Sequence, residues 1–218
     1  MTKARCTPLW QAIPCPLSDI EGLESWLGDM AAQGLVPVTI GQNFARFRCS
    51  QPKAVRYRLN AKPAPETFLE SAPGTPDGEE RALAQECGWY YVTAVGDFFL
   101  YACEDRDAPE LNTDPQVQAL SLRYAKRQVF APAGLLAYWL VTFWVRYAMG
   151  VWHTPVIDFV ELGWLSFCYL GLLAAALASV VHNTVLLYRF SARLTRGAEP
   201  ERHKNWRKGA GRYLVGRV

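Results

Sequence analysis

Two stretches decide the fold: "GLVPVTIGQNFARFRC" (residues 34–49) and "GWYYVTAVGDFFLYAC" (residues 88–103), which align without a gap at a shift of 54 residues. Each reads as a glycine followed by two short strands of alternating polarity. The five identical pairs are Gly34/Gly88, Val38/Val92, Thr39/Thr93, Phe44/Phe98 and Cys49/Cys103. The pattern indicates that the N-terminal part of the chain is an internal duplication.

A helix is predicted before each pair of strands. Ser18 and Glu21 stand at capping-box spacing, and an apolar stripe at helical spacing follows them. That stripe comprises Leu23, Trp26, Leu27 and Met30. Pro76 can open a second, shorter helix that Gly88 ends. With further strands near residues 7–13 and 55–60, residues 1–122 are predicted to be an α+β domain. It would be a duplicated β-α-β-β unit with one antiparallel sheet and both helices on one face.

The domain also resembles a known family. The segments "ESWLGDMAAQGL", "FARFRC", "VRYRLN", "ECGWYYV", "DFFLYAC" and "ELNTDPQVQ" are similar to the bacterial domain-of-unknown-function family 2812, over roughly residues 15–120. Leu35 departs from the tryptophan usual in that family after the first glycine. The resemblance implies a membrane-tethered bacterial protein whose relatives are often encoded near transcriptional regulators. It supplies no activity and no catalytic residues.

Charge divides the chain into unlike parts. Residues 1–122 carry 16 acidic and 10 basic side chains, whereas residues 189–218 carry 9 basic and 2 acidic ones. Two apolar runs, 130–151 and 159–188, lie between them and are long enough to cross a bilayer as helices. They are joined by a short polar turn at 152–158. The sequence therefore predicts a two-helix transmembrane hairpin after the α+β domain.

The basic residues predict how this hairpin is oriented. A basic juxtamembrane segment, residues 123–129, precedes it and the basic tail, residues 189–218, follows it. The turn contains no Lys or Arg, so the positive-inside rule places both termini in the cytoplasm and the turn outside. We expect a multi-pass protein of the cytoplasmic (inner) membrane with residues 1–122 in the cytosol. The basic tail would attract anionic lipid headgroups of the bilayer.

The apolar runs contain two groups of residues that suggest packing or function. Small residues at three- and four-residue spacing let helices approach closely, within the hairpin or in a homo-oligomer. They are Gly171, Ala175, Ala178 and Ser179. Polar residues inside a membrane are energetically costly, so they suggest pairing or a function. They are Arg146, Glu161, His182 and Asn183. Arg146 would reach outward or pair with Glu161, and the other two would hydrogen-bond across the hairpin.

The sequence contains no enzyme signature. All three histidines, His153, His182 and His203, lie in or after the apolar region, so the α+β domain lacks the commonest general base. The carboxylates of its two helices look like solvated faces, and no Gly-rich phosphate loop is present. The six cysteines show no C-x-x-C pair and no His at ligand spacing, which predicts reduced thiols. We expect a protein that is not an enzyme and has no catalytic residues, metal or cofactor.

One group of side chains predicts binding. Phe44, Arg46 and Arg48 on one predicted strand, and Arg56 and Arg58 on the next, would emerge from one face of a hairpin. This arginine face is either a solvated sheet or a docking face for anionic lipid, an acidic protein segment or phosphate. Nucleic acid is not expected, because the domain is net negative and Phe44 is the lone neighbouring ring for stacking.

These features favour a membrane-tethered, non-enzymatic regulatory or adaptor protein that binds a protein partner through its cytosolic domain. A first alternative is a sensor that binds a small ligand in a cleft between the two β-α-β-β units. A second is an accessory subunit of a membrane transport complex.

Overall fold

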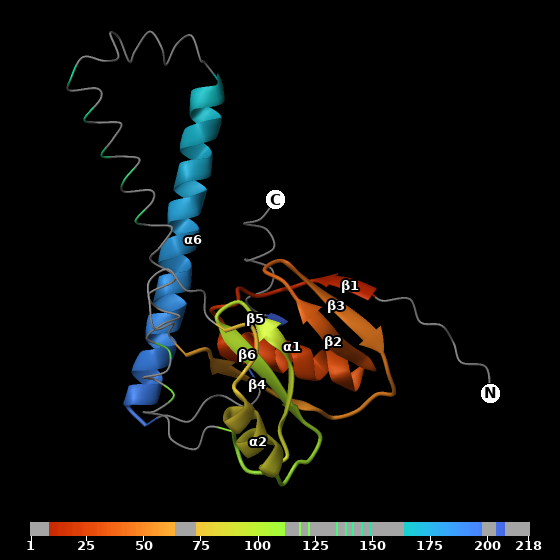
Figure 1. The fold of residues 1–218 in the computed structure, drawn as a ribbon. Helices are drawn as coiled ribbons and strands as arrows, with labels where there is room; N and C mark the ends of the chain where they lie inside the picture. The colour runs from red at the N-terminus through yellow and green to blue at the C-terminus, as the bar shows by residue number, and fades with distance from the viewer. Residues whose placement is uncertain are drawn as a thin grey trace. The chain divides into compact units, whose positions relative to one another are not determined.

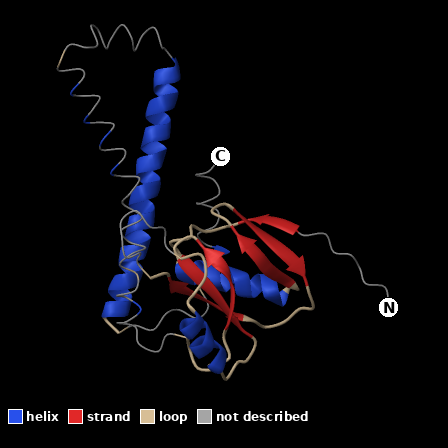
Figure 2. Cartoon of the chain, viewed as in Figure 1, coloured by secondary structure: helices blue, strands red, loops and turns tan. Residues whose placement is uncertain are grey.

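The computed structural model describes residues 9–63, 73–111, 164–197 and 204–207, with a few single positions between 118 and 149 (Figures 1 and 2). The chain divides into two compact units. The first combines residues 1–125 with residues 189–218, and the second comprises residues 126–188. The α+β domain and the last residues of the chain therefore belong to the same unit.

The described elements follow the order β-α-β-β-β-α-β-β, with a long helix after them (Figure 1). The strands are β1 (Leu9–Ala12), β2 (Leu35–Ile40), β3 (Phe44–Cys49), β4 (Arg56–Ala61), β5 (Tyr90–Val95) and β6 (Phe98–Cys103). The helices are α1 (Ile20–Ala32), α2 (Gly78–Glu86) and α6 (Trp164–Thr195).

The strands form two antiparallel three-stranded sheets, with the orders β1-β3-β2 and β4-β6-β5. The prediction of one sheet is therefore wrong. In each half the last strand is central and uses both of its edges, so β3 has no free edge for β4. The edge strands β2 and β5 contact one another, but each contains a bulge, which bends a strand and disrupts its ladder.

The 54-residue repeat extends to backbone details. The register of β2 shifts between Pro37 and Thr39, and that of β5 shifts between Tyr91 and Thr93, at equivalent positions. Gly34 and Gly88 end the helices of their halves with φ of 82° and 81°, a conformation that glycine adopts at low cost. The two halves therefore share their local geometry as well as their strand order.

Helix α1 packs between the two sheets and contacts β2 and β4. It begins one residue later than the capping-box spacing predicts, because Asp19 is the N-cap and accepts a hydrogen bond from the Gly22 amide at 3.1 Å. Trp26 is buried and meets Phe47 of β3 edge to face, with ring centroids 5.5 Å apart. The sequence had predicted both helices on one face of a single sheet. This is wrong, because α1 contacts strands of both sheets and α2 contacts β5.

The second sheet is built around β6, whose six residues are all buried. Such a continuous apolar run is typical of a strand that is covered on both faces. One of these faces packs under α2. Its cluster consists of Ala84, Trp89, Phe99, Tyr101 and Cys103.

The predicted transmembrane hairpin is overturned. Among the helices that the structure describes, none is both long and apolar enough to cross a membrane. The predicted span 130–151 and turn 152–158 lie outside the described residues, apart from a few single positions. Helix α6 runs past the predicted end of the second span, and His182, Asn183 and Arg189 lower the hydropathy of its described part. The predicted membrane hairpin and multi-pass inner-membrane location are therefore corrected by this finding.

One of the described cysteines differs from the prediction of reduced thiols. Cys15 and Cys103 are buried free thiols and Cys87 is an exposed one. Cys49, at the end of β3, is disulfide-bonded, so the prediction that the cysteines are reduced is wrong at this position.

Candidate functional site

The five residues of the predicted arginine face do not lie together. Arg46 and Arg48 belong to β3 in the first sheet, whereas Arg56 and Arg58 belong to β4 in the second sheet. The prediction relied on a β3–β4 hairpin, and these two strands are not paired. The structure therefore separates one predicted surface into two sites with different surroundings.

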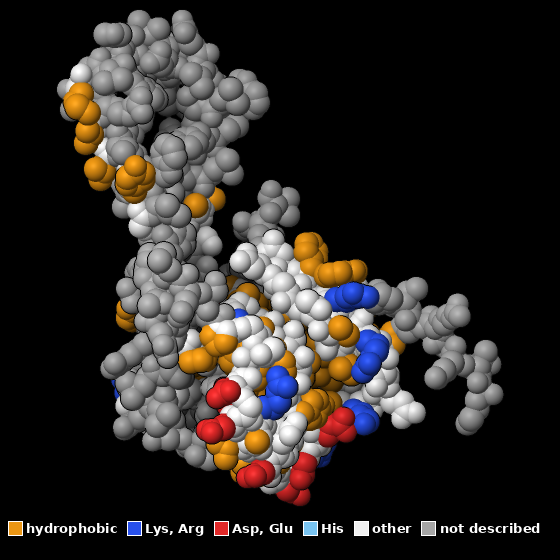
Figure 3. Space-filling view, in the orientation of Figure 1, with side chains coloured by type: hydrophobic (Ala, Val, Ile, Leu, Met, Phe, Trp, Pro, Cys, Tyr) orange, Lys and Arg blue, Asp and Glu red, His pale blue; other side chains and the backbone are white. Residues whose placement is uncertain are grey.

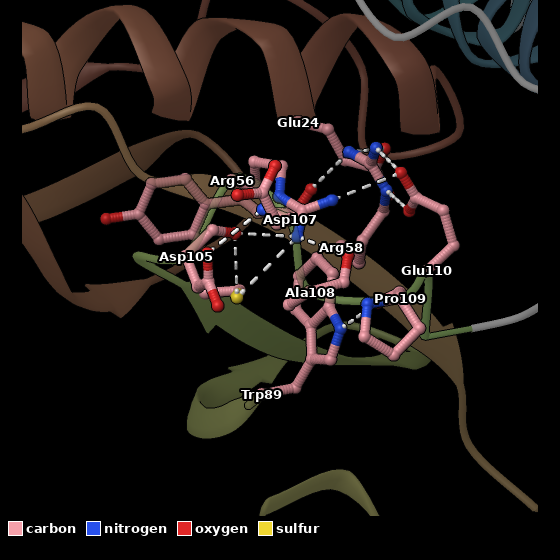
Figure 4. A network of polar contacts seen from close by, with 11 residues as sticks. Glu24, Arg56, Arg58, Trp89, Asp105, Asp107, Ala108, Pro109 and Glu110 are labelled. Atoms are coloured by element: carbon pink, nitrogen blue, oxygen red, sulfur yellow. Dashed lines mark hydrogen bonds and ion pairs between the residues drawn. The ribbon is translucent and has the colours of Figure 1, made fainter. Parts of the chain in front are cut away.

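Arg58 lies in a network of ion pairs that ties β4 to α1 and to the segment after β6 (Figure 4). Its guanidinium reaches Glu110 with two bonds, Nε to Oε2 at 2.9 Å and Nη2 to Oε1 at 3.1 Å. Its Nη1 lies 3.4 Å from Oε2 of Glu24 on α1. A two-pronged arginine–carboxylate pair fixes geometry as well as charge, so Arg58 connects three segments that are distant in the sequence.

The guanidinium of Arg56 binds backbone carbonyl groups of the same segment after β6. Its Nη2 donates to the carbonyl oxygens of Asp105 at 2.7 Å and Ala108 at 2.8 Å. Its guanidinium carbon lies 5.1 Å from the centroid of the Trp89 ring, and Trp89 Nε1 donates to the Pro109 carbonyl at 2.8 Å (Figure 4). The contacts of Arg56 and Arg58 are thus those of structural residues that close the segment after β6 over its sheet.

Glu24 is the most unusual titratable group of this network. Its side chain is 8% exposed, and its Oε1 accepts a hydrogen bond from the backbone amide of Leu59 at 2.8 Å. Burial raises the pKa of Glu24 to about 7, and this effect outweighs the attraction of Arg58 and the hydrogen bond from Leu59, which both lower it. The sequence did not single out Glu24, because its spacing on α1 resembles that of a solvated carboxylate.

The other half of the predicted face is open to solvent. Phe44 is 55% exposed, and Arg46 and Arg48 follow it on the same face of β3 and are exposed. On β1, Trp10 is 61% exposed and lies directly opposite Arg46 in the strand register. Opposed residues project from one face with their Cβ atoms about 5 Å apart. Figure 3 shows hydrophobic side chains beside Lys or Arg side chains over this part of the molecule.

We call Trp10, Phe44, Arg46 and Arg48 the docking face. Its counterpart in the second sheet, at a shift of 54 residues, comprises Phe98, Leu100 and Ala102, which are 4%, 0% and 1% exposed. The same face of the repeated unit is therefore covered in one sheet and uncovered in the other. Trp10 was missed by the sequence prediction, although the alternation of β1 places it on this face.

The polar and small residues of the predicted hairpin are described in part. Arg146 and Glu161 lie outside the described residues. The small residues Gly171, Ala175, Ala178 and Ser179 are exposed on α6. His182 is exposed, and Asn183 donates to Ser179 Oγ of the same helix at 3.4 Å. This hydrogen bond of Asn183 lies within α6, whereas the sequence predicted one across a hairpin.

Among the described residues, no group of three or more His, Cys, Asp or Glu side chains is placed to hold a metal ion.

Comparison with known proteins gave one match. The model of a family described as "Protein of unknown function (DUF2812)" matches residues 19–133, which is slightly more than half of the chain. The match includes α1, both central strands and the segment that carries Glu110. No curated protein and no solved structure matches the chain.

Proposed function

Because this chain belongs to the DUF2812 family, whose function is unknown, we propose its function from its own surfaces: a non-enzymatic adaptor or regulatory protein. In this proposal the docking face binds an acidic protein segment that carries apolar side chains. The observation that carries the proposal is the exposed pair of Trp10 and Arg46, which lie side by side on β1 and β3.

Composition supports a protein-binding role for this face. Tryptophan and arginine are enriched among the residues that contribute most of the energy at protein interfaces, and exposed apolar groups mark such sites. Here Trp10 and Phe44 supply apolar area, and Arg46 and Arg48 supply charge. All four residues lie on two paired strands, so the surface is rigid before binding.

Charge supports an acidic partner. In the part of the chain that the structure describes, neither Arg46 nor Arg48 makes an ion pair, whereas Arg56 and Arg58 both do. The domain around them carries more acidic than basic side chains, so the docking face is a basic patch on a domain of net negative charge. Such a patch favours an acidic segment and repels a basic one.

The repeat supplies independent support. In the second sheet, the face that carries Phe98, Leu100 and Ala102 is buried within the molecule. The equivalent face of the first sheet is uncovered and retains two large aromatic side chains. A partner that covers them would bury apolar area that the fold leaves in water.

A library of random peptides displayed on phage and panned on the full chain tests this proposal. We expect enriched peptides to combine Asp or Glu with aromatic or aliphatic residues. Their affinity should fall about tenfold or more for Trp10→Ala and for Arg46→Glu/Arg48→Glu, since residues of this kind each contribute more than about 1.4 kcal/mol at interfaces. Matched controls are Leu83→Ala and Arg106→Glu, which change exposed side chains elsewhere.

Two results would contradict the proposal. The first is a set of peptides that bind the docking-face variants as well as they bind the parent chain. The second is binding of a single-stranded oligonucleotide that the same variants abolish, which would assign the face to nucleic acid.

A further inference from the structure

The outward face of α1 carries a polar stripe opposite its apolar one. Glu21, Ser25 and Asp29 are four residues apart and therefore share one face of the helix, and the N-cap Asp19 stands at its start. A stripe of this kind normally lies in water, yet Glu21 and Ser25 are 2% and 6% exposed. Something other than the sheets covers this side of α1.

The cover comes from residues near the end of the chain, which belong to the same compact unit. Arg193, in the last turn of α6, forms an ion pair with Glu21. Beyond it, Lys204 Nζ lies 2.6 Å from Asp19 Oδ1, and the Lys204 amide donates to Ser25 Oγ at 3.0 Å. Trp206 Nε1 donates to Asp29 Oδ2 at 2.8 Å.

These contacts involve two residues, Lys204 and Trp206, of a short segment. Lys204 and Trp206 are half-buried, whereas Asn205 and Arg207 between and after them are exposed. The stripe thus accepts an ammonium group at Asp19, a backbone amide at Ser25 and an indole N–H at Asp29. Each acceptor meets a different donor of the sequence Lys-x-Trp, which is more selective than attraction between opposite charges alone.

We infer that the outward face of α1 is a binding site for a basic, tryptophan-containing segment of a partner protein, and that residues 204–206 occupy it as an intramolecular competitor. This site goes beyond the proposed function, because it lies on another element from the docking face and has the opposite charge. The chain's own segment identifies the chemistry that the site accepts.

The geometry of the site allows residues 204–206 to be displaced by the segment of a partner protein. Side chains of the Lys204–Asp19 pair are 32% and 17% exposed, and ion pairs that reach solvent contribute little to stability. The attached segment competes at an effective concentration of about 1 mM, as is usual for short connections. The Arg193–Glu21 pair, with Glu21 3% exposed, would stay in place when residues 204–206 leave.

A labelled peptide with the sequence of residues 203–208, HKNWRK, tests the inference on full-length chains by fluorescence anisotropy. The chain variant Lys204→Glu/Trp206→Ala should bind this peptide at least tenfold more tightly than the parent chain, because its site is vacated. Adding Asp19→Asn and Asp29→Asn to that variant should abolish binding. Asn205→Ala, in the chain or in the peptide, is the matched control and should change nothing.

A second measurement follows the competitor itself. Trypsin should cut after Arg207 faster in Trp206→Ala than in the parent chain or Asn205→Ala, and thermal melts show whether each variant is folded. The inference is overturned if a folded Lys204→Glu/Trp206→Ala chain binds the peptide no better than the parent chain does. Arg46→Glu/Arg48→Glu should leave peptide binding intact, so this test and that of the docking face can fail separately.

Discussion

The carboxylate of Glu24 accepts a hydrogen bond from the backbone amide of Leu59 at 2.8 Å, and so links α1 to β4. Strand β4 is at the edge of its sheet, where backbone donors have no neighbouring strand. A buried side chain thus satisfies a donor that would otherwise be costly. The same carboxylate pairs with Arg58, so Glu24 joins the helix, the edge strand and the segment around Glu110.

The first prediction concerns the pH dependence of stability. Burial raises the pKa of Glu24 from 4.5 to about 7, so the folded protein holds a proton there that the unfolded chain releases in that interval. The free energy of unfolding should therefore fall as pH rises from 4.5 to 7 and level off above, by up to about 3 kcal/mol from this group. Glu24→Gln should flatten the slope in urea titrations at several pH values. Glu86→Gln, at an exposed position, should leave it unchanged; an unchanged slope in Glu24→Gln would refute the assignment.

The second prediction separates the four arginines. Arg56→Gln/Arg58→Gln should lower the free energy of unfolding by about 3 kcal/mol or more, because Glu24 and Glu110 would lose their partners. Arg46→Gln/Arg48→Gln should change it by less than about 0.5 kcal/mol, as expected for exposed positions. Urea denaturation of both double variants measures the contrast. Equal effects of the two pairs would show that β3 and β4 carry one common surface after all.

The third prediction compares two tryptophans. Trp26 is 2% exposed and packs on Phe47, so Trp26→Ala should destabilise the protein by about 3–5 kcal/mol through lost burial and a cavity. Trp10, on the docking face, is 61% exposed, and Trp10→Ala should cost less than about 0.5 kcal/mol. Thermal or urea unfolding distinguishes them. A small effect at Trp26 would mean that α1 presents a different face to the first sheet.

The fourth prediction compares the equivalent glycines of the repeat. Both have positive φ, so alanine at either position should cost about 1–2 kcal/mol of backbone strain. At Gly34 the new Cβ would also lie 2.6 Å from the Ser50 carbonyl oxygen, whereas at Gly88 its nearest neighbour is 3.5 Å away. Gly34→Ala should therefore lower the unfolding free energy more than Gly88→Ala, by at least about 1 kcal/mol given how costly overpacking is. The reverse order would be incompatible with the turn after α1.

Local features of this fold follow from the sequence because their causes are local. The two stretches at residues 34–49 and 88–103 each predicted a glycine followed by two short strands, and the structure places β2 with β3 and β5 with β6 there. The glycines after α1 and α2 predicted where both helices end, since a positive φ at the next residue needs no distant contact. The equivalence of the two halves was visible for the same reason.

Features that depend on distant contacts were not predicted. Strand pairing separated Arg46 from Arg56, because a central strand has two edges and both edges of β3 were already used. The hydropathy of the apolar runs suggested a membrane hairpin, but none of the helices that the structure describes is both long and apolar enough to cross a membrane.

Within the duplicated α+β domain, the sequence by itself thus determined the order of strands and helices, the glycines that end both helices and the correspondence of the two halves. Only the tertiary structure decided that Glu21 and Glu24 are buried, that Arg58 is structural and that Trp10 stands beside Arg46. The physical reason is range: backbone conformation is set by neighbours within a few residues, whereas the burial of a charge depends on partners brought from far along the chain. Glu21 meets Arg193 across 172 positions.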